Sequence, residues 1–451
     1  MTSVRVLAAR VLMAVDNRRA PLGAEVDRAR RGLTDERDRG LLLELTSGVC
    51  RWRAELDACL TPCSQRPLDA IDPPLLATLR VAMYQLRHLD RVPAHAVVHE
   101  SVEAARVLDA PRAAGFVNGV LRTYLRTRDT IALPPRPREG ATRRQHLAYL
   151  SVTLSHPRWL VARWLDRYGF DATERWCQFN NAAPDITVRA RWPGVGVPAL
   201  LVALEERGVP AARGRYAADV VRLPPGALSS IDQDLRSDLV VQDEGSVLVA
   251  HVAGAQPGER VLDLCAAPGG KTMILWADMN GQGQLVASDT RWARMQVLRD
   301  TVRETTLADQ LLVLDATSPL PFAAGTFDRV FVDVPCSGLG TLRRDPDVKW
   351  AVTMESLPAL AATQRRILAQ AASVVRPGGT LIYATCSSEP DENDAVIDAF
   401  LAESRVFAAQ PIDSAVGFGE LIDDKGRLHT TPPRHGLDAF FAARLVRREL
   451  A

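Results

Sequence analysis

The sequence predicts a multidomain protein with an all-α domain first, a small α+β module next, and a doubly wound α/β domain last. Three observations support this fold class. The 451 residues are too many for one ordinary hydrophobic core. Up to about residue 128, apolar residues recur at three- and four-residue spacing, which is typical of helices. From residue 241 onward, short apolar runs alternate regularly with helical segments, which is typical of strands covered by helices.

The first domain, expected over residues 1–132, consists of helices alone. Apolar residues follow helical spacing in Val4–Val15, Leu75–Leu86 and Ala94–Arg106, and turn residues separate these runs. The module is also basic: residues 1–150 contain 24 arginines against 17 acidic residues, whereas the net charge of the whole chain is only +1. Such an excess suggests a polyanionic partner, and a solvated helical surface explains it about equally well.

Residues 133–144 are rich in proline and arginine, so we expect an interdomain linker there. Residues 145–240 then mix helical and strand-like stretches. The strand-like pieces are Ile186–Arg191 and Asp219–Leu223, and a helical stretch, Pro198–Gly208, lies between them. This mixture predicts a small α+β connecting module.

The last domain is expected over residues 241–451. Its short apolar runs, which are typical of buried strands, are Arg260–Leu264, Gln284–Ser288, Leu311–Leu314, Arg329–Asp333 and Thr380–Ala384. Helical segments such as Trp292–Val302 and Ser356–Val375 separate them. Near-continuous apolar strands that alternate with helices imply a parallel sheet covered on both faces. In such a sheet, ligands bind beyond the carboxyl ends of the strands.

The composition excludes several classes of protein. No run approaches the roughly 18 consecutive apolar residues that a membrane span needs, and the start of the chain lacks the apolar region of a signal peptide. We therefore expect a cytoplasmic protein. The seven cysteines are odd in number and scattered, which fits reduced thiols better than a disulfide framework. Cys59 and Cys63 form the only close pair, without a second pair at zinc spacing, so we expect no metal.

Polar or reactive residues follow the predicted strands. After the first comes Cys265–Lys271, in which Gly269 and Gly270 let the backbone approach a ligand and open a helix with exposed N–H groups. This turn has neither the dinucleotide-binding nor the triphosphate-binding glycine spacing. Asp289 ends the second strand, where a carboxylate can accept hydrogen bonds from ribose, and Asp315 follows the third, placed to meet an adenine. An adenosine-containing ligand without a phosphate tail fits best.

Two cysteines follow the last two predicted strands. Cys336 lies in Asp-Val-Pro-Cys-Ser-Gly, and Cys386 lies in Ala-Thr-Cys-Ser-Ser. Taken singly, each would be a small buried hydrophobic residue. Placed together at two strand ends, beside a site for a nucleotide-type cofactor, they imply covalent chemistry on a poorly nucleophilic carbon.

The motifs of this half resemble those of the RNA cytosine-C5 methyltransferases (the NOL1/NOP2/Sun family), which use S-adenosylmethionine. The similar segments are Val261–Thr272, Asp333–Trp350 and Thr385–Asn393. The resemblance implies a Rossmann-like methyltransferase domain with S-adenosylmethionine as cofactor. Cytosine C5 is a weak nucleophile, so this reaction needs a prior covalent bond at C6, for which a thiolate is the natural attacker. A second group must help to remove the C5 proton, which explains the second cysteine.

The helical domain resembles the NusB-like RNA-binding domain. The similar segments are Leu43–Arg51, Met83–Leu86, Val92–Glu103 and Phe116–Arg122. A NusB-like domain ahead of these catalytic motifs is similar to the arrangement in the RsmB (Sun/Fmu) branch, which methylates small-subunit (16S) ribosomal RNA. The resemblance therefore implies ribosomal RNA as the partner and no membrane. We expect the protein to be a monomer.

The family pattern assigns different roles to the two cysteines, although chemistry alone would allow the roles to be exchanged. Cys386 would be the nucleophile, and Cys336 would promote release of the product. Asp333 would hydrogen-bond the N3/N4 edge of cytosine. The full set of predicted cofactor-binding residues is Cys265, Ala266, Ala267, Pro268, Gly269, Gly270, Lys271, Asp289, Arg294, Asp315 and Asp333.

Several basic residues have roles that stay open. Lys271 could contact the cofactor carboxylate or an RNA phosphate, or could only begin a helix. Arg343, Arg344 and Lys349 follow the Pro-Cys motif and could hold the RNA backbone, although a solvated loop fits nearly as well.

A transfer RNA substrate stays open, because methyltransferases of this family that act on different RNAs share the catalytic core. Other functions fit less well. A methyltransferase for exocyclic amines would favour an Asn/Asp-Pro-Pro-aromatic motif, where this chain has Asp333-Val-Pro-Cys336. A non-catalytic NusB-like RNA-binding or antitermination factor would tolerate loss of Cys386 and of the glycine turn, and both are intact.

Overall fold

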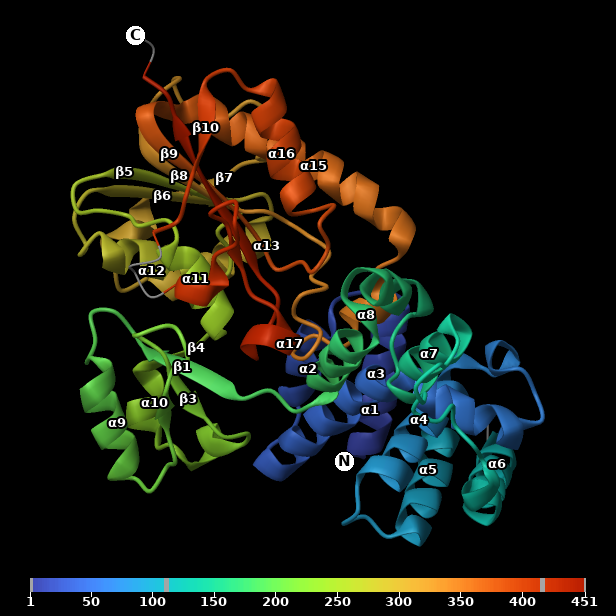
Figure 1. The fold of residues 1–451 in the computed structure, drawn as a ribbon. Coiled ribbons are helices and arrows are strands. Elements are labelled where there is room, and N and C mark those ends of the chain that lie inside the picture. Colours follow the sequence, from blue (N-terminus) through green and yellow to red (C-terminus); the bar gives the residue numbers. More distant parts are fainter. Residues whose placement is uncertain (1–2, 109–112, 414–417, 450–451) are drawn as a thin grey trace. The chain divides into compact units, whose positions relative to one another are not determined.

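The chain divides into two compact units in the computed structural model (Figure 1). The residues that the structure describes are 3–108, 113–413 and 418–449. The first unit comprises Met1–Ala182 together with Leu342–Met354, and the second comprises Ala183–Thr341 together with Glu355–Ala451. The domain boundaries expected from the sequence stay a prediction.

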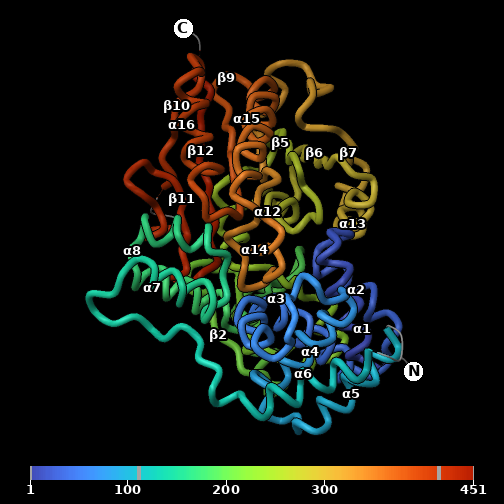
Figure 2. The backbone as a smooth tube through the Cα atoms, turned by 90° about the vertical axis from the view of Figure 1, so that its right-hand side faces the viewer, coloured from blue at the N-terminus to red at the C-terminus, as the bar shows by residue number. Residues whose placement is uncertain are grey.

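The first unit is helical, as predicted. Its leading helices are α1 (Val4–Asp16), α2 (Leu22–Arg30), α3 (Glu36–Ser64), α4 (Pro73–His88), α5 (Ala94–Leu108) and α6 (Ala113–Thr127). Polar side chains begin two of them, because Ser3 caps α1 and Asp35 caps α3 by accepting hydrogen bonds from free backbone N–H groups. The apolar stripes of these helices form one shared core. In Figure 2, α4, α5 and α6 run side by side.

Helices α3 and α4 approach each other closely at Gly48. A Cβ atom on this residue would lie 2.0 Å from the ring of Tyr84, so only glycine leaves room for the ring. The Tyr84 hydroxyl donates a hydrogen bond to Glu44 of α3. Arg80 of α4 forms two hydrogen bonds of 2.8 Å with the Asp57 carboxylate of α3. Close packing and a two-pronged ion pair therefore join these helices.

The remaining parts of the first unit come from two places in the sequence. Helices α7 (Arg143–Ala148) and α8 (Arg158–Asn181) follow the proline-rich stretch. The segment Leu342–Met354, which contains α14 (Val348–Ala351), also belongs to this unit although it follows the Pro-Cys motif. Local sequence patterns did not predict that placement.

Residues 145–182 of the predicted connecting module belong to the first unit, whereas the part from residue 183 onward lies in the second unit and has α+β character. Its strands are β1 (Ile186–Ala190), β2 (Ala212–Arg213), β3 (Val221–Leu223) and β4 (Leu239–Val241), and its helices are α9 (Val197–Glu205) and α10 (Gln233–Ser237). The strands form an antiparallel sheet in the order β2-β3-β1-β4. Leu200 and Leu204 of α9 share a buried cluster with Val188 of β1, so the helix covers this sheet.

The larger sheet of the second unit has the strand order β10-β12-β9-β8-β5-β6-β7, with β11 paired to β12. Its strands are β5 (Arg260–Leu264), β6 (Gln284–Asp289), β7 (Leu311–Val313), β8 (Phe327–Asp333), β9 (Val375–Thr385), β10 (Phe407–Gln410), β11 (Leu428–His429) and β12 (Phe441–Arg447). The strands predicted from apolar runs, β5 to β9, are all present and run parallel to one another. The doubly wound α/β fold is confirmed.

The sheet as a whole is mixed, whereas the strand pattern predicts a purely parallel sheet. Strand β12 lies antiparallel between β9 and β10. In its described residues, the segment between β10 and β12 contains the short strand β11 and helices that are all short, such as α17 (Pro432–His435). Parallel neighbours need a long crossover connection, usually a helix. This segment supplies none, so the strand returns in the opposite direction.

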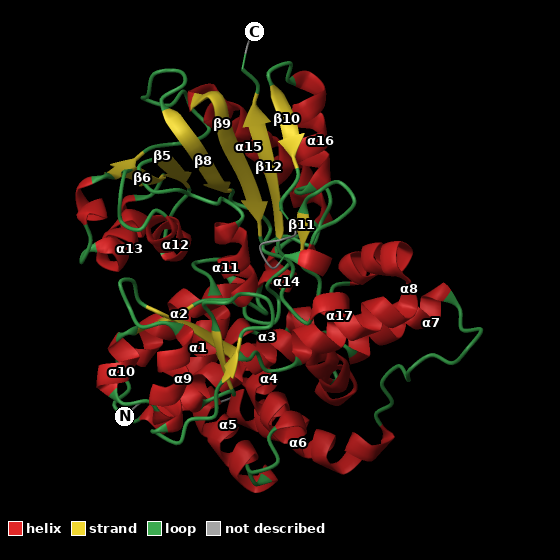
Figure 3. Ribbon diagram, turned by 60° about the vertical axis from the view of Figure 1, so that its left-hand side comes forward, coloured by secondary structure: helices red, strands yellow, loops and turns green. Residues whose placement is uncertain are grey.

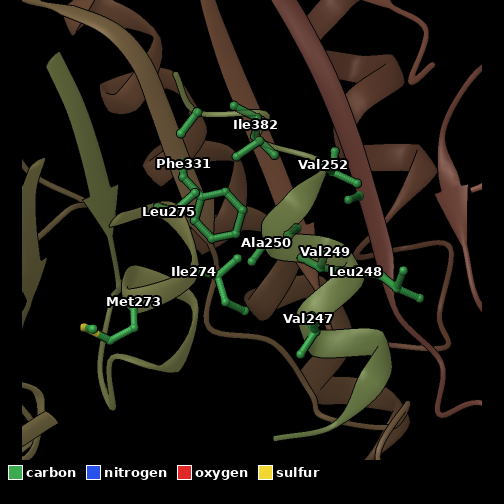
Figure 4. Packing of buried hydrophobic residues seen from close by; sticks show 14 of the residues in the cluster. Val247, Leu248, Val249, Ala250, Val252, Met273, Ile274, Leu275, Phe331 and Ile382 are labelled. Atoms are coloured by element: carbon green, nitrogen blue, oxygen red, sulfur yellow. The ribbon is translucent and has the colours of Figure 1, made fainter. Parts of the chain in front are cut away.

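Helices cover both faces of the larger sheet (Figure 3). They are α11 (Glu244–His251), α12 (Gly270–Asp278) and α13 (Trp292–Val302) on one face, and α15 (Leu357–Val374) and α16 (Asp394–Glu403) on the other. Side chains alternate along each strand. Phe331 and Ile382 therefore pack among residues of α11 and α12 (Figure 4), while Val332 belongs to the cluster of the opposite face. Among the described helices, none has the length and apolarity that a membrane span requires.

Candidate active site

Two cysteine loops meet at the carboxyl ends of the neighbouring strands β8 and β9. Cys336 follows β8 closely, and Cys386 comes directly after β9. The two strands are parallel, with Asp333 paired to Ala384, so they deliver their loops to the same edge of the sheet. The Sγ atoms of the two cysteines lie 3.3 Å apart. The structure thus brings together two residues that are distant in the sequence.

Backbone hydrogen bonds hold the two loops together. The N–H of Gly340 donates to the carbonyl of Cys386 at 2.9 Å, and the N–H of Ala439 donates to the carbonyl of Gly340 at 2.9 Å. A Cβ atom on residue 340 would lie 1.9 Å from the Ala439 oxygen and 2.7 Å from the Cys386 oxygen. Only glycine permits this approach, so the backbone itself sets how close the two loops lie.

The surroundings of Cys336 favour its protonated form. The hydrogen bond with the Cys386 sulfur, together with burial and nearby negative charge, raises the pKa of Cys336 well above its ordinary value. Cys336 is therefore a thiol at neutral pH and can donate its S–H hydrogen to the Cys386 sulfur. A Cys386 thiolate would accept this hydrogen bond, whereas a Cys386 thiol could also donate it.

Asp333, the last residue of β8, pairs with Lys271 in the first turn of α12. The Lys271 Nζ lies 2.7 Å from the Asp333 Oδ2. Burial opposes the charged form of the lysine, but the Asp333 carboxylate outweighs it and raises the pKa of Lys271. Lys271 therefore does more than begin a helix, because its ammonium group orients the predicted catalytic carboxylate.

The glycine turn before α12 lines a pocket of about 240 Å³. Gly269 has φ +104°, and a Cβ atom there would lie 2.7 Å from Leu298, so the turn requires glycine. The predicted cofactor-binding residues that line the pocket are Cys265, Ala266, Ala267, Pro268, Gly270, Lys271 and Asp333. Its wall also contains residues outside that set, namely Val240, Val241, Gln242, Ser246, Asp263 and Thr301.

A buried carboxylate in the pocket wall tests whether the cofactor fits. Asp263 Oδ2 accepts a hydrogen bond from the Thr272 hydroxyl at 2.6 Å, whereas Oδ1 has no partner in the described part of the chain. Burial raises the pKa of Asp263 to about 7. An ammonium group beside Oδ1 would favour the ionised form and satisfy the free oxygen. S-adenosylmethionine carries such a group, so the pocket suits this cofactor.

Four predicted cofactor residues lie outside the pocket lining, namely Gly269 of the turn itself and Asp289, Arg294 and Asp315. Asp289 is buried at the end of β6, and its Oδ2 lies 3.3 Å from the Arg294 Nε. Arg294 also donates to the carbonyl of Ala267, which links both residues to the glycine turn. Asp315 is exposed and accepts hydrogen bonds from the N–H and hydroxyl of Thr317, which lower its pKa. The cofactor-binding roles of these residues, like those of the residues that line the pocket, stay predictions.

The expectation of a solvated or RNA-binding loop is wrong for Lys349. This side chain is 1% exposed within the helical unit, and its Nζ donates to the carbonyl of Arg51 at 2.7 Å. Burial lowers the pKa of Lys349 to about 7. The neighbouring Trp350 donates from Nε1 to the carbonyl of Cys50 at 2.6 Å, and the carbonyl of Arg343 accepts from Arg51 at 3.0 Å. The segment is thus anchored in a helical core that is remote in sequence.

One group of potential metal ligands does not include the cysteines. In the described part of the chain, the side chains near enough to share an ion are Asp394, Asp423 and His429. Arg427 donates a hydrogen bond to Asp394, so an ion pair already occupies this group. The predicted absence of a metal stays a prediction.

Some residues of the site carry no sequence signal. Arg189 of β1 is buried and donates to the Gln242 Oε1 at 2.9 Å and to the Gly270 carbonyl at 3.1 Å, which supports the glycine turn from the connecting module. Glu392 is buried and accepts hydrogen bonds from Ser337, which directly follows Cys336. Glu392 lies in a segment that resembles the family, but nothing local distinguishes a buried glutamate from an exposed one.

Family models match three parts of the chain. The model described as "NusB family" matches residues 2–126. The model described as "Methyltr_RsmF/B-like, ferredoxin-like domain" matches residues 156–227, within the connecting module. The model described as "16S rRNA methyltransferase RsmB/F" matches residues 250–446, which contain both cysteines.

Similar proteins cover nearly the whole chain. It is 33% identical over 425 residues to the probable ribosomal RNA small subunit methyltransferase B of Bacillus subtilis (strain 168), covering 90% of each chain. It is 35% identical over 445 residues to the ribosomal RNA small subunit methyltransferase B of Pseudomonas putida, covering 98% of each. A solved structure described as "Crystal Structure of PH0851" matches with a TM-score of 0.81 and 24% identity over 99% of each chain. The chain therefore belongs to the RsmB/F family of S-adenosylmethionine-dependent methyltransferases.

Proposed function

We propose that this enzyme methylates C5 of a cytosine in RNA through a covalent bond between Cys386 and C6 of the base. The observation that carries the proposal is the pair of sulfur atoms 3.3 Å apart, at the ends of β8 and β9. Methyl transfer to nitrogen or oxygen needs no such pair, because those atoms have lone pairs of their own. Two thiols suit a carbon that must first be made nucleophilic and must later lose a proton.

The reaction begins with addition of the Cys386 thiolate to C6. The new S–C6 bond uses the sulfur electron pair, the C5=C6 double bond opens, and N3 takes up a proton from solvent. Asp333 would accept hydrogen bonds from the protonated N3 and the N4 amino group, and Lys271 would hold that carboxylate in place, since its Nζ lies 2.7 Å away. S-adenosylmethionine, when bound, supplies an electrophilic methyl group to which C5 bonds as the bond from that methyl to sulfur breaks.

Release of the product depends on Cys336. Once Cys386 is a thioether, its sulfur no longer holds the proton on Cys336 by charge and hydrogen bonding, so Cys336 can lose that proton to solvent. The Cys336 thiolate then takes the proton from C5. The electrons of the C5–H bond restore the C5=C6 double bond, the S–C6 bond breaks, and its electron pair returns to Cys386. N3 returns its proton to solvent, so one proton is released overall.

The RNA is proposed to be small-subunit ribosomal RNA. The relatives from Bacillus subtilis and Pseudomonas putida carry that substrate in their names. The excess of arginine over acidic residues in the first 150 residues supports an RNA partner. An enzyme that acts on ribosomal RNA would work in the cytoplasm, the location that the sequence predicts.

Two cysteine variants test the reaction. Cys386→Ala is expected to abolish methyl transfer, whereas Cys336→Ala is expected to form a protein–RNA adduct that survives a denaturing gel. Full turnover by Cys386→Ala would refute the mechanism. Bisulfite sequencing of total RNA from a strain lacking the gene identifies the substrate: loss of 5-methylcytosine from small-subunit ribosomal RNA is expected. A loss from transfer RNA would assign that RNA instead, and an unchanged pattern would refute cytosine methylation.

A further inference from the structure

The carboxylate of Glu392 lies between the two cysteine loops. Its side chain is buried, with 0% exposure. Oε1 accepts a hydrogen bond from the N–H of Ser337 at 2.8 Å, and Oε2 accepts one from the Ser337 hydroxyl at 2.5 Å. Oε2 also accepts a hydrogen bond from the Ser387 hydroxyl at 2.5 Å. Ser337 directly follows Cys336, and Ser387 directly follows Cys386, so one carboxylate holds the neighbours of both reacting sulfurs.

The environment of Glu392 differs from that of an ordinary structural glutamate. Among the described residues, none with a positive charge pairs with it, and a further donor is the Gln364 Nε2 at 2.9 Å. A buried carboxylate without a counter-ion is costly to stabilise, and an apolar residue of similar size would cost less. Four neutral donors nevertheless converge on this one. The position of the Glu392 carboxylate is therefore explained by the cysteine loops that it holds, and not by a contribution to general stability.

The two loops depend on Glu392 to different extents. The Cys386 loop has another anchor, because the Asn393 Nδ2 donates to the Ser387 carbonyl at 2.9 Å and Thr385 donates to the Asn393 Oδ1 at 2.5 Å. The Cys336 loop donates two hydrogen bonds to this carboxylate through Ser337. Its other side-chain anchor, Gln364, donates to the Pro335 carbonyl at 3.1 Å and is itself held by Glu392. Loss of the Glu392 carboxylate should therefore loosen Cys336 more than Cys386.

The charge of Glu392 acts on the same sulfur. The Cys386 sulfur and burial raise the pKa of Cys336 most strongly, and the negative charge of Glu392 raises it further. Before the adduct forms, this charge helps to keep Cys336 protonated. Geometry and charge at Glu392 thus both bear on Cys336, the residue assigned to product release.

We propose that Glu392 is a positioning residue for the release step: it clamps the loop of Cys336 against the loop of Cys386, so that Cys336 meets the C5 proton of the adduct. This inference rests on the proposed function, because it takes the roles of the two cysteines from there. Glu392 acts through Ser337 and Ser387 and has no contact of its own with the base in this scheme.

Variants at Glu392 separate the length of the side chain from its charge. Glu392→Ala removes the clamp, and Glu392→Asp keeps the charge but is too short to reach both serines. Both are expected to lower kcat by about 100-fold, the loss typical of misplacing a reacting group by about 1 Å, with KM for RNA and for S-adenosylmethionine unchanged. Both should accumulate the protein–RNA adduct, because attack by Cys386 continues while release slows. Glu392→Gln has the original length and should restore most of kcat.

The pH profile adds a readout that a merely structural glutamate would not move. In Glu392→Gln, loss of the negative charge should lower the pKa of Cys336, so the acidic limb of the release rate should shift to lower pH. Glu389→Ala is a matched control, because Glu389 is also 0% exposed in the same segment but its Oε1 accepts a hydrogen bond from Ser388. It should not accumulate adduct, whatever its effect on stability.

The outcomes distinguish the two proposals. If Cys336→Ala fails to trap an adduct, the proposed function fails. The proposal for Glu392 is refuted by a different result. In that case Cys336→Ala traps an adduct, while folded Glu392→Ala and Glu392→Asp turn over at the normal rate and accumulate no adduct. Circular dichroism establishes folding, and Glu392→Asp decides the question if Glu392→Ala does not fold. Equal adduct in Glu389→Ala would also overturn the clamp, since the effect would then belong to any buried glutamate of the segment.

Discussion

Replacing the buried Lys349 by methionine should change how the stability of the helical unit depends on pH. The pKa of Lys349 is about 7 in the folded protein, compared with 10.5 for the free side chain. Between these values the unfolded chain binds more protons than the folded one, so stability rises with pH. For a single group with these two pKa values, the gain in the free energy of unfolding from pH 7 to pH 9 is about 2 kcal/mol.

Methionine fills a similar volume and does not titrate, so the Lys349→Met variant lacks this gain. The difference in the free energy of unfolding, variant minus wild type, should fall by about 2 kcal/mol between pH 7 and pH 9. The hydrogen bond that the variant loses, to the carbonyl of Arg51, shifts the difference equally at both pH values. Groups common to both proteins cancel in the difference.

Urea unfolding followed by the circular dichroism of the helices measures this quantity at each pH. Lys425→Met is the matched control, because Lys425 is exposed and its ion pair with Asp398 lies at the surface. The control should show a difference that does not vary with pH. A flat difference for Lys349→Met would refute the reasoning, since it would mean that Lys349 stays charged in the folded protein.

Two glycine variants test close backbone approaches. Gly340→Ala should lower the rate of single-turnover methyl transfer by about 100-fold. Its Cβ atom would lie 1.9 Å from the carbonyl oxygen of Ala439, so the cysteine loops would have to separate. A normal rate would contradict the coupling of the loops. Gly48→Ala should destabilise the helical unit by about 1–3 kcal/mol in urea unfolding, because the added methyl group would displace the ring of Tyr84; an unchanged midpoint would show that the two helices lie farther apart.

Much of the fold could be predicted because its signals are local. Helical spacing in Val4–Val15 and apolar runs such as Arg329–Asp333 depend on residues that are neighbours in the sequence. The antiparallel placement of strand β12 (Phe441–Arg447) between β9 and β10 was not predicted, because it depends on a connection without a crossover helix. Local patterns indicate that a strand exists but do not determine its neighbours.

The candidate site also combines features that the sequence predicts with features that depend on tertiary packing. The turn at Gly269 and the two cysteine motifs are visible in the sequence, because their residue types are tied to a conformation or to a chemistry. Glu392 and Lys349 gave no such signal, since an isolated glutamate or lysine is usually exposed. Their burial results from packing against segments that are close in space.

The sequence by itself determined the order of helical, mixed and α/β parts, the glycine turn and the two cysteine motifs, because each depends on a short run of residues. Only the tertiary structure decided that the sulfur atoms of Cys336 and Cys386 lie 3.3 Å apart, that Glu392 lies between their loops, and that Lys349 is buried among helices. These features require long-range strand pairing and core packing, which bring together residues that no local pattern connects.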